Sequence, residues 1–148
     1  MASRPNHPVP SKGPADPRSG YVFVYGTLMQ GQRLHRHLGK PGEVQFIGPA
    51  KIRAELYRLR ARRYPAAIAA PRSQRFVFGE LYRMRDPLRT LTSLDKVEGC
   101  NEGLFERRLA DVWVRGKKKR AWTYFFAQPL VKAEIVPTGR FPYQQASA

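Results

Sequence analysis

The sequence predicts an α+β domain built around a small, strongly curved, mixed β-barrel that short helices flank. Most of its patterned segments have the composition or the two-residue period of strands, and only two segments have a helical pattern. Strands and helices also do not alternate regularly, which argues against a parallel sheet of βαβ units. The chain has 148 residues, of which 42% are hydrophobic, so we expect one packed core.

The first half of the chain predicts three strands and one short helix. Tyr21–Tyr25 is a continuous run of β-branched and aromatic residues between glycines, which is typical of a buried strand. Residues 32–38 have the pattern of a short helix that ends at Gly39. Residues 44–47 predict a second strand, and the alternation of apolar and polar residues over 50–59 predicts a third.

The middle of the chain predicts another strand and the longer helix. The turn sequence Tyr64-Pro65-Ala66 leads into a short apolar segment, and residues 76–84 predict a strand with Phe76, Phe78 and Tyr82 on one face. Asp86 suits the N-cap and Pro87 the first position of a helix that runs to Val97. The spacing of Leu88, Leu91, Leu94 and Val97 predicts the apolar face of this helix.

The last patterned segments predict a hairpin and one short element. Residues 105–114 and 121–127 form the hairpin, residues 115–120 its basic tip, and residues 135–139 the final element. The domain is therefore expected to span residues 21–142. Residues 1–20 and 143–148 are predicted to be tails, because the first is rich in Pro, Ser, Gly and Arg and the second is polar.

The formal net charge of +16 is large for a chain of this length. Such a charge attracts polyanions without specificity, so it is compatible with a solvated basic surface or with a polyanion site. The basic segment 115–120 has no interleaved aromatic residues for base stacking. We therefore expect nucleic-acid binding to be absent or non-specific and directed at the phosphate backbone.

Cysteine and histidine are too few for several kinds of site. Cys100 is the only cysteine, which excludes a disulfide within the chain, and one cysteine with three histidines makes a zinc site improbable. His35 and His37 are two positions apart and would not face each other on a helix. No apolar run has the ~18 residues of a membrane helix, and the N-terminus lacks a signal-peptide core. We expect a cytoplasmic protein without a membrane partner.

Two motifs carry the candidate chemistry. The strand Tyr21–Tyr25 runs into Gly26, Thr27 and Leu28, and a glycine turn of this kind directs backbone N–H groups toward one point, where they can bind an anion. Glu98 follows the apolar face of the predicted helix and precedes Gly99. An anion cradle and a partly desolvated carboxylate suit proton transfer on a small anionic substrate.

An ordered set of motifs resembles the γ-glutamylcyclotransferase-like family, which includes the AIG2-like and γ-glutamylamine cyclotransferase groups. The resemblance covers residues 21–141. The motifs, in order, are Val22-Phe23-Val24-Tyr25-Gly26-Thr27-Leu28, Tyr64-Pro65-Ala66, Val77-Phe78-Gly79-Glu80-Leu81-Tyr82, Leu94-Asp95-Lys96-Val97-Glu98-Gly99, Phe105-Glu106-Arg107-Arg108 and Ala121-Trp122-Thr123-Tyr124.

The resemblance implies a barrel of roughly six strands with helices around it and a cavity for a γ-glutamyl group. It also implies a reaction, without metal or cofactor, that releases 5-oxoproline and a free amine from a γ-glutamyl amine or peptide. Glu98 is then the expected acid/base. The expected substrate-binding residues are Tyr25, Gly26, Thr27, Leu28, Tyr64 and Tyr124, although Tyr25, Tyr64 and Tyr124 also suit a purely structural role.

Several alternatives remain open at this point. Glu80 and Asp95 are rival carboxylates, for which an ion pair and a capping or orienting role are expected. Phe105 stands where the family usually has Tyr, and Arg140-Phe141 where many members have Asp-Trp. A non-catalytic small-ligand-binding module on the same fold and a basic polyanion-binding protein are the competing functions. The leaving amine is not determined, and we expect a monomer or a weak dimer.

Overall fold

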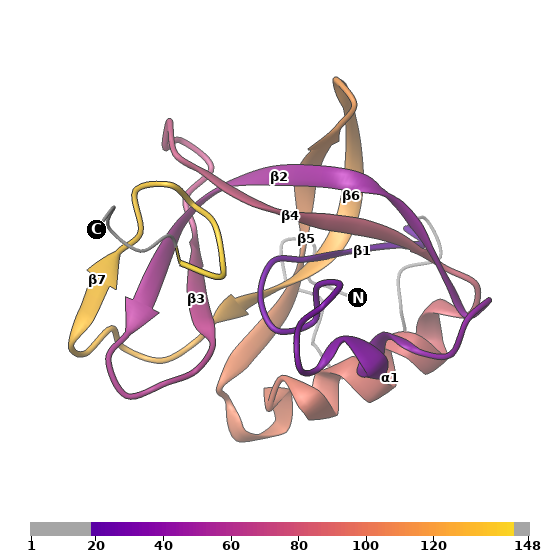
Figure 1. Cartoon of the computed structure of the whole chain (residues 1–148), viewed down its shortest axis with the longest axis horizontal. Coiled ribbons are helices and arrows are strands. Elements are labelled where there is room, and N and C mark those ends of the chain that lie inside the picture. Colours follow the sequence, from indigo (N-terminus) through magenta and orange to yellow (C-terminus); the bar gives the residue numbers. More distant parts are fainter. Residues whose placement is uncertain (1–18, 144–148) are drawn as a thin grey trace, which may run out of the picture.

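A closed barrel of five strands forms the centre of the fold in the computed structural model, which describes residues 19–143 (Figure 1). Its strands are β1 (Tyr21–Val24), β2 (Val44–Leu59), β4 (Phe76–Met84), β5 (Phe105–Val114) and β6 (Lys117–Phe126). They follow one another in the order β2-β4-β1-β6-β5, and β5 pairs with β2 to close the ring. Because β1 and β6 run parallel while the other pairs are antiparallel, the barrel is mixed, as predicted.

The long strand β2 belongs to two structures. Its first part lies in the barrel, and its last residues pair with β3 (Pro65–Ala69) and β7 (Ala133–Ile135), which extend the sheet beyond the barrel (Figure 1). The predicted strands 44–47 and 50–59 are therefore one strand. The register against β4 shifts between Phe46 and Gly48, and this irregularity precedes Pro49, a residue that sheets accept at bulges.

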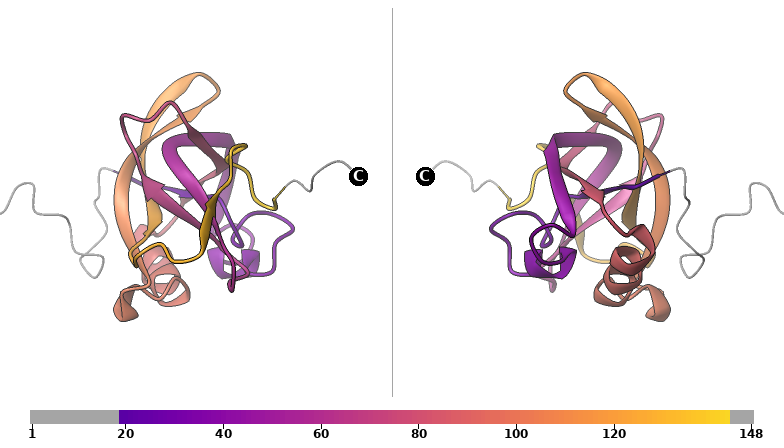
Figure 2. Two further views of the ribbon diagram at one scale, coloured as in Figure 1. Left: turned by 90° about the vertical axis from the view of Figure 1, so that its left-hand side faces the viewer. Right: turned by 90° about the vertical axis from the view of Figure 1, so that its right-hand side faces the viewer.

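Two hydrophobic clusters lie on the two faces of the sheet. Val77 and Leu81 of β4 point into the barrel, whereas Tyr82 and Met84 belong to the cluster that contains Leu91 and Leu94 of the helix α1. The views in Figure 2 show α1 alongside one end of the barrel. The even-numbered residues of β4 share the outer face, as predicted, but α1 covers only the later ones, and Phe76 and Phe78 stay half-buried.

The helix α1 (Pro87–Val97) has its predicted bounds, and the Asp86 side chain accepts a hydrogen bond from the Arg89 N–H at 3.3 Å. Leu88 is an exception on its apolar face, because it is 56% exposed. The helical pattern over 32–38 was only partly right. These residues form turns followed by a single turn of 3-10 helix, η1 (His35–Leu38). A second 3-10 turn, η2 (Cys100–Glu102), follows α1.

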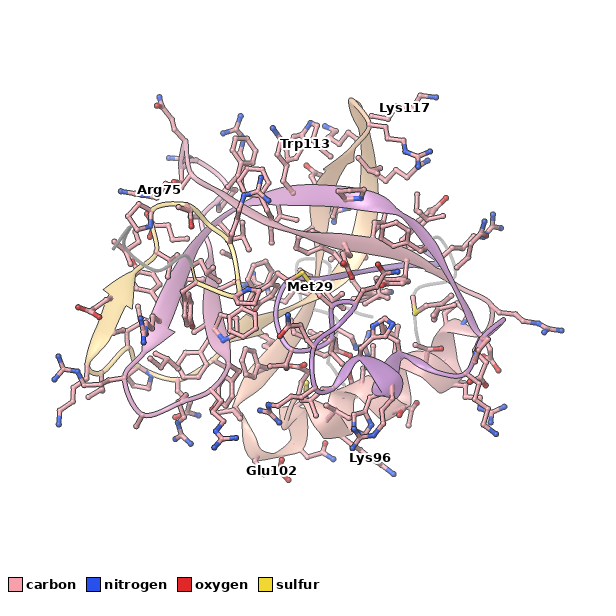
Figure 3. The ribbon with its side chains drawn as sticks, viewed as in Figure 1. Met29, Arg75, Lys96, Glu102, Trp113 and Lys117 are labelled. Carbon is pink, nitrogen blue, oxygen red and sulfur yellow. The ribbon has the colours of Figure 1, made fainter. Side chains whose placement is uncertain are left out.

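The hairpin of β5 and β6 has a tighter turn than predicted. Val114 pairs with Lys117, so the turn consists of Arg115 and Gly116 alone, with φ of 52° and 77°. Two positive φ values are typical of a type I′ turn. Residues 117–120 therefore belong to β6 and not to the tip. Figure 3 shows Lys117 and Trp113 on the side of the barrel away from Lys96 of α1.

The first described residue, Ser19, is hydrogen-bonded to β6. Its hydroxyl donates to the Arg120 carbonyl at 2.8 Å, and the next residue, Gly20, accepts from the Met84 N–H at 2.7 Å. The remaining residues of the predicted N-terminal tail and most of the C-terminal one lie outside the described range. Within residues 19–143, no helix has both the length and the apolar character needed to span a membrane.

Gly79 of β4 leaves no room for a side chain beside the end of β1. A Cβ there would contact the Val24 carbonyl oxygen, and would lie 2.8 Å from Cζ of Phe23 and 3.0 Å from Cα of Tyr25. We expect Gly79→Ala to lower the free energy of unfolding by about 1–3 kcal/mol, because the strands must separate to admit the methyl group. Urea unfolding measures this. The control is Gly20→Ala, whose Cβ would meet its nearest atom at 3.9 Å, and an equal loss in both variants would contradict the steric argument.

Candidate active site

One pocket lies between the end of β1 and the end of α1, and Tyr64 and Pro65 form part of its wall. It holds about 330 Å³ of empty space, its open mouth included. All seven residues predicted for the site line it, although they come from four separate stretches of the chain. The lining residues are Phe23, Val24, Tyr25, Gly26, Thr27, Leu28, Tyr64, Pro65, Glu98, Phe105 and Tyr124.

The segment Gly26–Leu28, which was predicted as an anion cradle, lines the pocket with backbone N–H groups that have no partner among the described residues. None of its three N–H groups donates to another residue within the described range, while its carbonyls are all engaged. Gly26 O accepts from the Met29 N–H at 3.0 Å, Thr27 O from the Leu34 N–H at 2.9 Å, and Leu28 O lies 2.8 Å from His35 Nδ1. Fixed carbonyls and free N–H groups leave this loop able to bind an anion.

Glu80 supports the cradle from the neighbouring strand. Its Oε1 accepts hydrogen bonds from the Gln30 N–H and from the Tyr82 hydroxyl, each at 2.9 Å. Glu80 thus has a structural role, as expected, but it acts through hydrogen bonds. The expected ion pair does not occur among the described residues.

Gly26 allows the cradle to pack on the opposite wall of the pocket. A Cβ at this position would lie 2.9 Å from both Cγ and Cδ of Pro65. Any larger residue would therefore push the N–H groups away from Tyr64 and Pro65 and open the pocket.

Glu98 caps the C-terminus of α1, and its carboxylate faces the pocket. Its own backbone N–H donates to the Leu94 carbonyl at 2.8 Å, which fixes the residue at the end of the helix. Its carboxylate has no hydrogen-bond or ion-pair partner in residues 19–143. Burial and, to a lesser degree, the negative charge of Asp95 raise the pKa of Glu98 from 4.5 to about 7. A carboxyl with this pKa exchanges protons readily near neutral pH.

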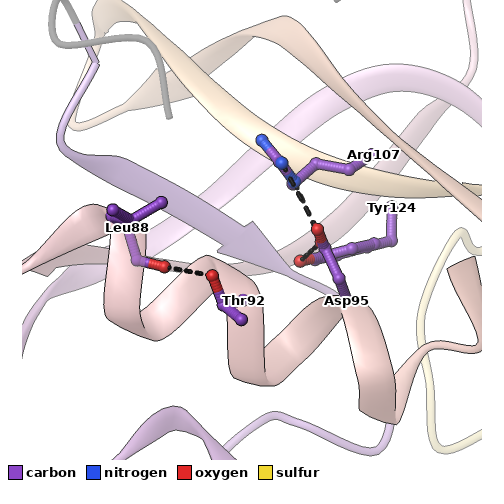
Figure 4. Close-up of polar contacts among 5 residues, drawn as sticks. All are labelled: Leu88, Thr92, Asp95, Arg107 and Tyr124. Carbon is purple, nitrogen blue, oxygen red and sulfur yellow. Dashed lines mark hydrogen bonds and ion pairs between the residues drawn. The ribbon is translucent and has the colours of Figure 1, made fainter. Parts of the chain in front are cut away.

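Asp95, one helical turn before Glu98, is held in a different way. Its Oδ1 accepts from Arg107 Nε at 2.9 Å and from the Tyr124 hydroxyl at 2.7 Å, and its Oδ2 accepts from Arg107 Nη2 at 3.3 Å (Figure 4). Arg107 is 1% exposed and lies 4.5 Å over the Trp122 ring. Asp95 therefore orients the wall of the pocket, in agreement with one of the two expectations for it.

The hydroxyls of Tyr25 and Tyr124 are both engaged inside the protein. Tyr25 donates to the Tyr124 carbonyl at 2.7 Å and accepts from the Ala67 N–H at 3.3 Å, so it ties β1, β6 and β3 together. Burial raises the pKa of both hydroxyls well above 10. Their rings line the pocket, but neither hydroxyl has its proton available for a ligand.

Tyr64 differs from the other two tyrosines. Its hydroxyl is buried, and no described residue accepts or donates a hydrogen bond there. Its ring packs edge-on against Phe105 at 5.7 Å between centroids, and Phe105 packs in turn against Phe126 at 5.5 Å. Tyr64 is therefore the tyrosine whose hydroxyl can interact with a bound molecule.

Two other candidate centres are weak. Burial, together with Asp95 and Glu98, raises the pKa of the Cys100 thiol to about 12, which keeps it protonated and unreactive. Within residues 19–143, no three His, Cys, Asp or Glu side chains gather in a way that would hold a metal ion.

The predictions from sequence missed Phe23 and Val24 as lining residues and Arg107 as a support. A signal existed for Arg107. It lies two residues after Phe105 in a predicted strand and so shares the face of that apolar residue, where a charged side chain needs a buried partner. Phe105 was noted only as a departure from the family pattern, and its ring now forms part of the pocket wall.

The comparisons with known proteins place the chain in a family. The family model described as "Gamma-glutamyl cyclotransferase, AIG2-like" matches residues 22–143. A Methanocaldococcus jannaschii protein named "Putative gamma-glutamylcyclotransferase MJ1514" is 30% identical over 108 residues, which cover 73% of this chain and 85% of that protein.

Solved structures share the fold. An AIG2-like protein from Mus musculus superposes with a TM-score of 0.60 at 22% identity, over 87% of this chain and 97% of that one. YkqA from Bacillus subtilis gives 0.55 at 21% identity, over 72% of this chain, but this chain spans only 35% of YkqA. At these identities the likeness concerns the fold alone.

Proposed function

Because this chain belongs to the γ-glutamyl cyclotransferase, AIG2-like family, we propose that it converts a γ-glutamyl amine or peptide into 5-oxoproline and a free amine. One observation carries the proposal: the unpaired carboxylate of Glu98, with its pKa near 7, shares a pocket with the free N–H groups of Gly26–Leu28. A proton carrier and an anion cradle in one pocket are the two parts that this reaction needs.

The reaction is an intramolecular aminolysis. Glu98 takes a proton from the substrate's α-ammonium, and the resulting amine attacks the γ-carbonyl carbon and closes a five-membered ring. When the tetrahedral intermediate collapses, the bond from that carbon to the leaving nitrogen breaks, and the same carboxyl returns its proton to the departing amine. The ring nitrogen, which became cationic on attack, releases its second proton to water, and the free amine takes one up as it leaves. Acid/base catalysis of this kind contributes about 10²–10⁴-fold.

The rest of the pocket favours the ring-closing conformation. Both reacting groups belong to one molecule, so orientation alone can lower the barrier by up to ~7–11 kcal/mol. In this proposal, the N–H groups of Gly26–Leu28 hold the α-carboxylate or the oxygen of the γ-carbonyl. We assign to the Tyr64 hydroxyl a hydrogen bond to the substrate, since it has no partner among the described residues. The rings of Tyr25 and Tyr124 shape the cavity.

The proposal is tested by incubating the protein with γ-glutamyl amino acids, glutathione, γ-glutamyl-ε-lysine and γ-glutamyl alkylamines, followed by mass spectrometry of 5-oxoproline. The Glu98→Gln variant is the matched control, because it corrects for spontaneous cyclisation while it keeps the shape of the side chain. We expect product above that background from at least one compound, and the best compound identifies the leaving amine.

Two outcomes would contradict the proposal in different ways. Equal product from the wild type and Glu98→Gln would remove Glu98 from the chemistry. No product from any compound, combined with thermal stabilisation by the same compounds, would favour the non-catalytic binding module. The replacement of the family's usual Tyr by Phe105 makes that module the principal competing function.

A further inference from the structure

The outer face of the barrel carries aromatic rings with cations stacked on them, on the side away from α1. We define the aromatic–basic face as Lys51, Arg53, Phe76, Phe78, Trp113 and Arg140. Lys51 lies 4.4 Å and Arg53 4.7 Å from the centre of the Phe76 ring, and Arg140 lies 4.0 Å from that of Phe78. Arg53 is also 5.7 Å from Trp113.

The strand register explains how this face arises. Lys51 pairs with Phe78 on one side and with Trp113 on the other, and Trp113 pairs with Lys118. Because paired residues share a face of the sheet, the row across β4, β2, β5 and β6 reads aromatic, cation, aromatic, cation. Lys51, Phe78, Trp113 and Arg140 also line a shallow groove. The basic segment after the turn at Arg115 therefore lies beside aromatic rings that come from other strands.

The charges of this face are not neutralised from within the described part of the chain. The acidic side chains near it are engaged elsewhere, since Asp111 pairs with Arg120 at 3.1 Å and Glu55 accepts from the Tyr57 hydroxyl at 3.1 Å. Arg53 and Arg140 are exposed, and the guanidinium of Arg53 is fixed by its Nη1 donating to the Ser73 carbonyl at 2.8 Å. A guanidinium plane that covers a ring on one side offers its other side to a base.

We propose that the aromatic–basic face binds single-stranded nucleic acid. Alternating rings and cations are the combination that such a strand needs, because phosphates pair with the cations while bases stack on rings and guanidinium planes. An anionic membrane needs the charges but not a row of stacking surfaces. In Figure 3, Lys96 and Glu102 mark the end of α1, where Glu98 lies between them in the sequence. Trp113 and Arg75 lie on the opposite side of the molecule. Binding here is therefore separate from the proposed catalysis.

Fluorescence anisotropy with a labelled oligothymidylate of about 12 nucleotides tests this proposal, with a duplex of equal length and phosphatidylserine vesicles as competitors. The wild type and every variant are used as the full 148-residue chain. We expect the single strand to bind more tightly than the duplex, and Trp113→Ala to weaken single-strand binding about tenfold. Arg53→Gln should lower the slope of log K against log salt by about 0.7, the value for one phosphate contact on a single strand.

Matched controls separate stacking from general charge. Phe46 is an aromatic residue outside the face with 41% exposure, and Lys96 is a cation on α1, so Phe46→Ala and Lys96→Gln should retain binding. Trp113→Tyr should also retain binding, because tyrosine keeps a ring for stacking. Thermal melts of both Trp113 variants show whether a loss of binding comes from unfolding. The oligonucleotide should quench Trp113 fluorescence, because the other tryptophan, Trp122, is fully buried. Equal affinity for duplex and single strand, indifference to Trp113→Ala, or preference for vesicles would overturn the proposal.

Discussion

Glu98→Gln should lower kcat for 5-oxoproline release by about 10²–10⁴-fold, because glutamine cannot accept the proton of the substrate's α-ammonium. KM should change little, since the substrate's carboxylate and carbonyl contact other groups. Steady-state kinetics by mass spectrometry measures both constants. Glu102→Gln is the control, because Glu102 is an exposed carboxylate four residues away (Figure 3). More than half of the wild-type kcat in Glu98→Gln would be incompatible with an acid/base role.

The same substitution should change the dependence of stability on pH. The pKa of Glu98 is raised from 4.5 to about 7 in the folded chain, so between these values the folded state holds a proton that the unfolded state has released. Stability due to this group is therefore present below pH 4.5, falls as the pH rises to about 7, and stays low above it. The total is about 3 kcal/mol at 1.36 kcal/mol per pKa unit.

Thermal unfolding from pH 5 to pH 8 distinguishes the wild type from Glu98→Gln. The melting temperature of the wild type should fall over this interval relative to that of Glu98→Gln, which has no proton to lose. Parallel curves would mean that Glu98 is solvated in the folded chain and has an ordinary pKa. Ionisation of the buried Glu98 lowers the stability of the fold, and this loss is the physical cost of keeping a base desolvated.

Local signals in the sequence were enough for the single elements and not for their closure into a barrel. Asp86 and Pro87 marked the start of α1 because capping depends on neighbours within one turn. The pairing of β2 with β5 joins residues about sixty positions apart and leaves no local mark. The strand count of the barrel, five instead of roughly six, follows from that pairing, because β3 and β7 attach only to the extension of β2.

The candidate site shows the same division. Tyr25, Tyr64, Glu98 and Tyr124 were selected by family resemblance, and all line one pocket. The sequence could not show which hydroxyls are free, because the partners of Tyr25 and Tyr124 come from other elements. The aromatic–basic face was missed for a related reason. Its rings and cations are separated along the chain and become neighbours only across strands.

Asp95→Asn should lower the free energy of unfolding by about 3 kcal/mol. Asp95 is 14% exposed and pairs with Arg107, which is 1% exposed, so the substitution removes one charge of a buried ion pair. Asp111→Asn is the matched control, because Asp111 forms the same kind of pair with Arg120, but with side chains 42% and 58% exposed. An exposed pair contributes about 0–1 kcal/mol, so urea unfolding should separate the two variants clearly.

Asp95→Asn also tests whether Asp95 tunes Glu98. The negative charge of Asp95 is the second cause of the raised pKa of Glu98, after burial, so its removal should lower that pKa. The acidic limb of kcat/KM, which rises through about pH 7 in the wild type, should then move to lower pH. A merely structural residue would reduce stability and leave this limb in place. A shifted limb in Asp95→Asn, with no shift in Asp111→Asn, would make Asp95 a positioning residue that keeps Glu98 protonatable near neutral pH.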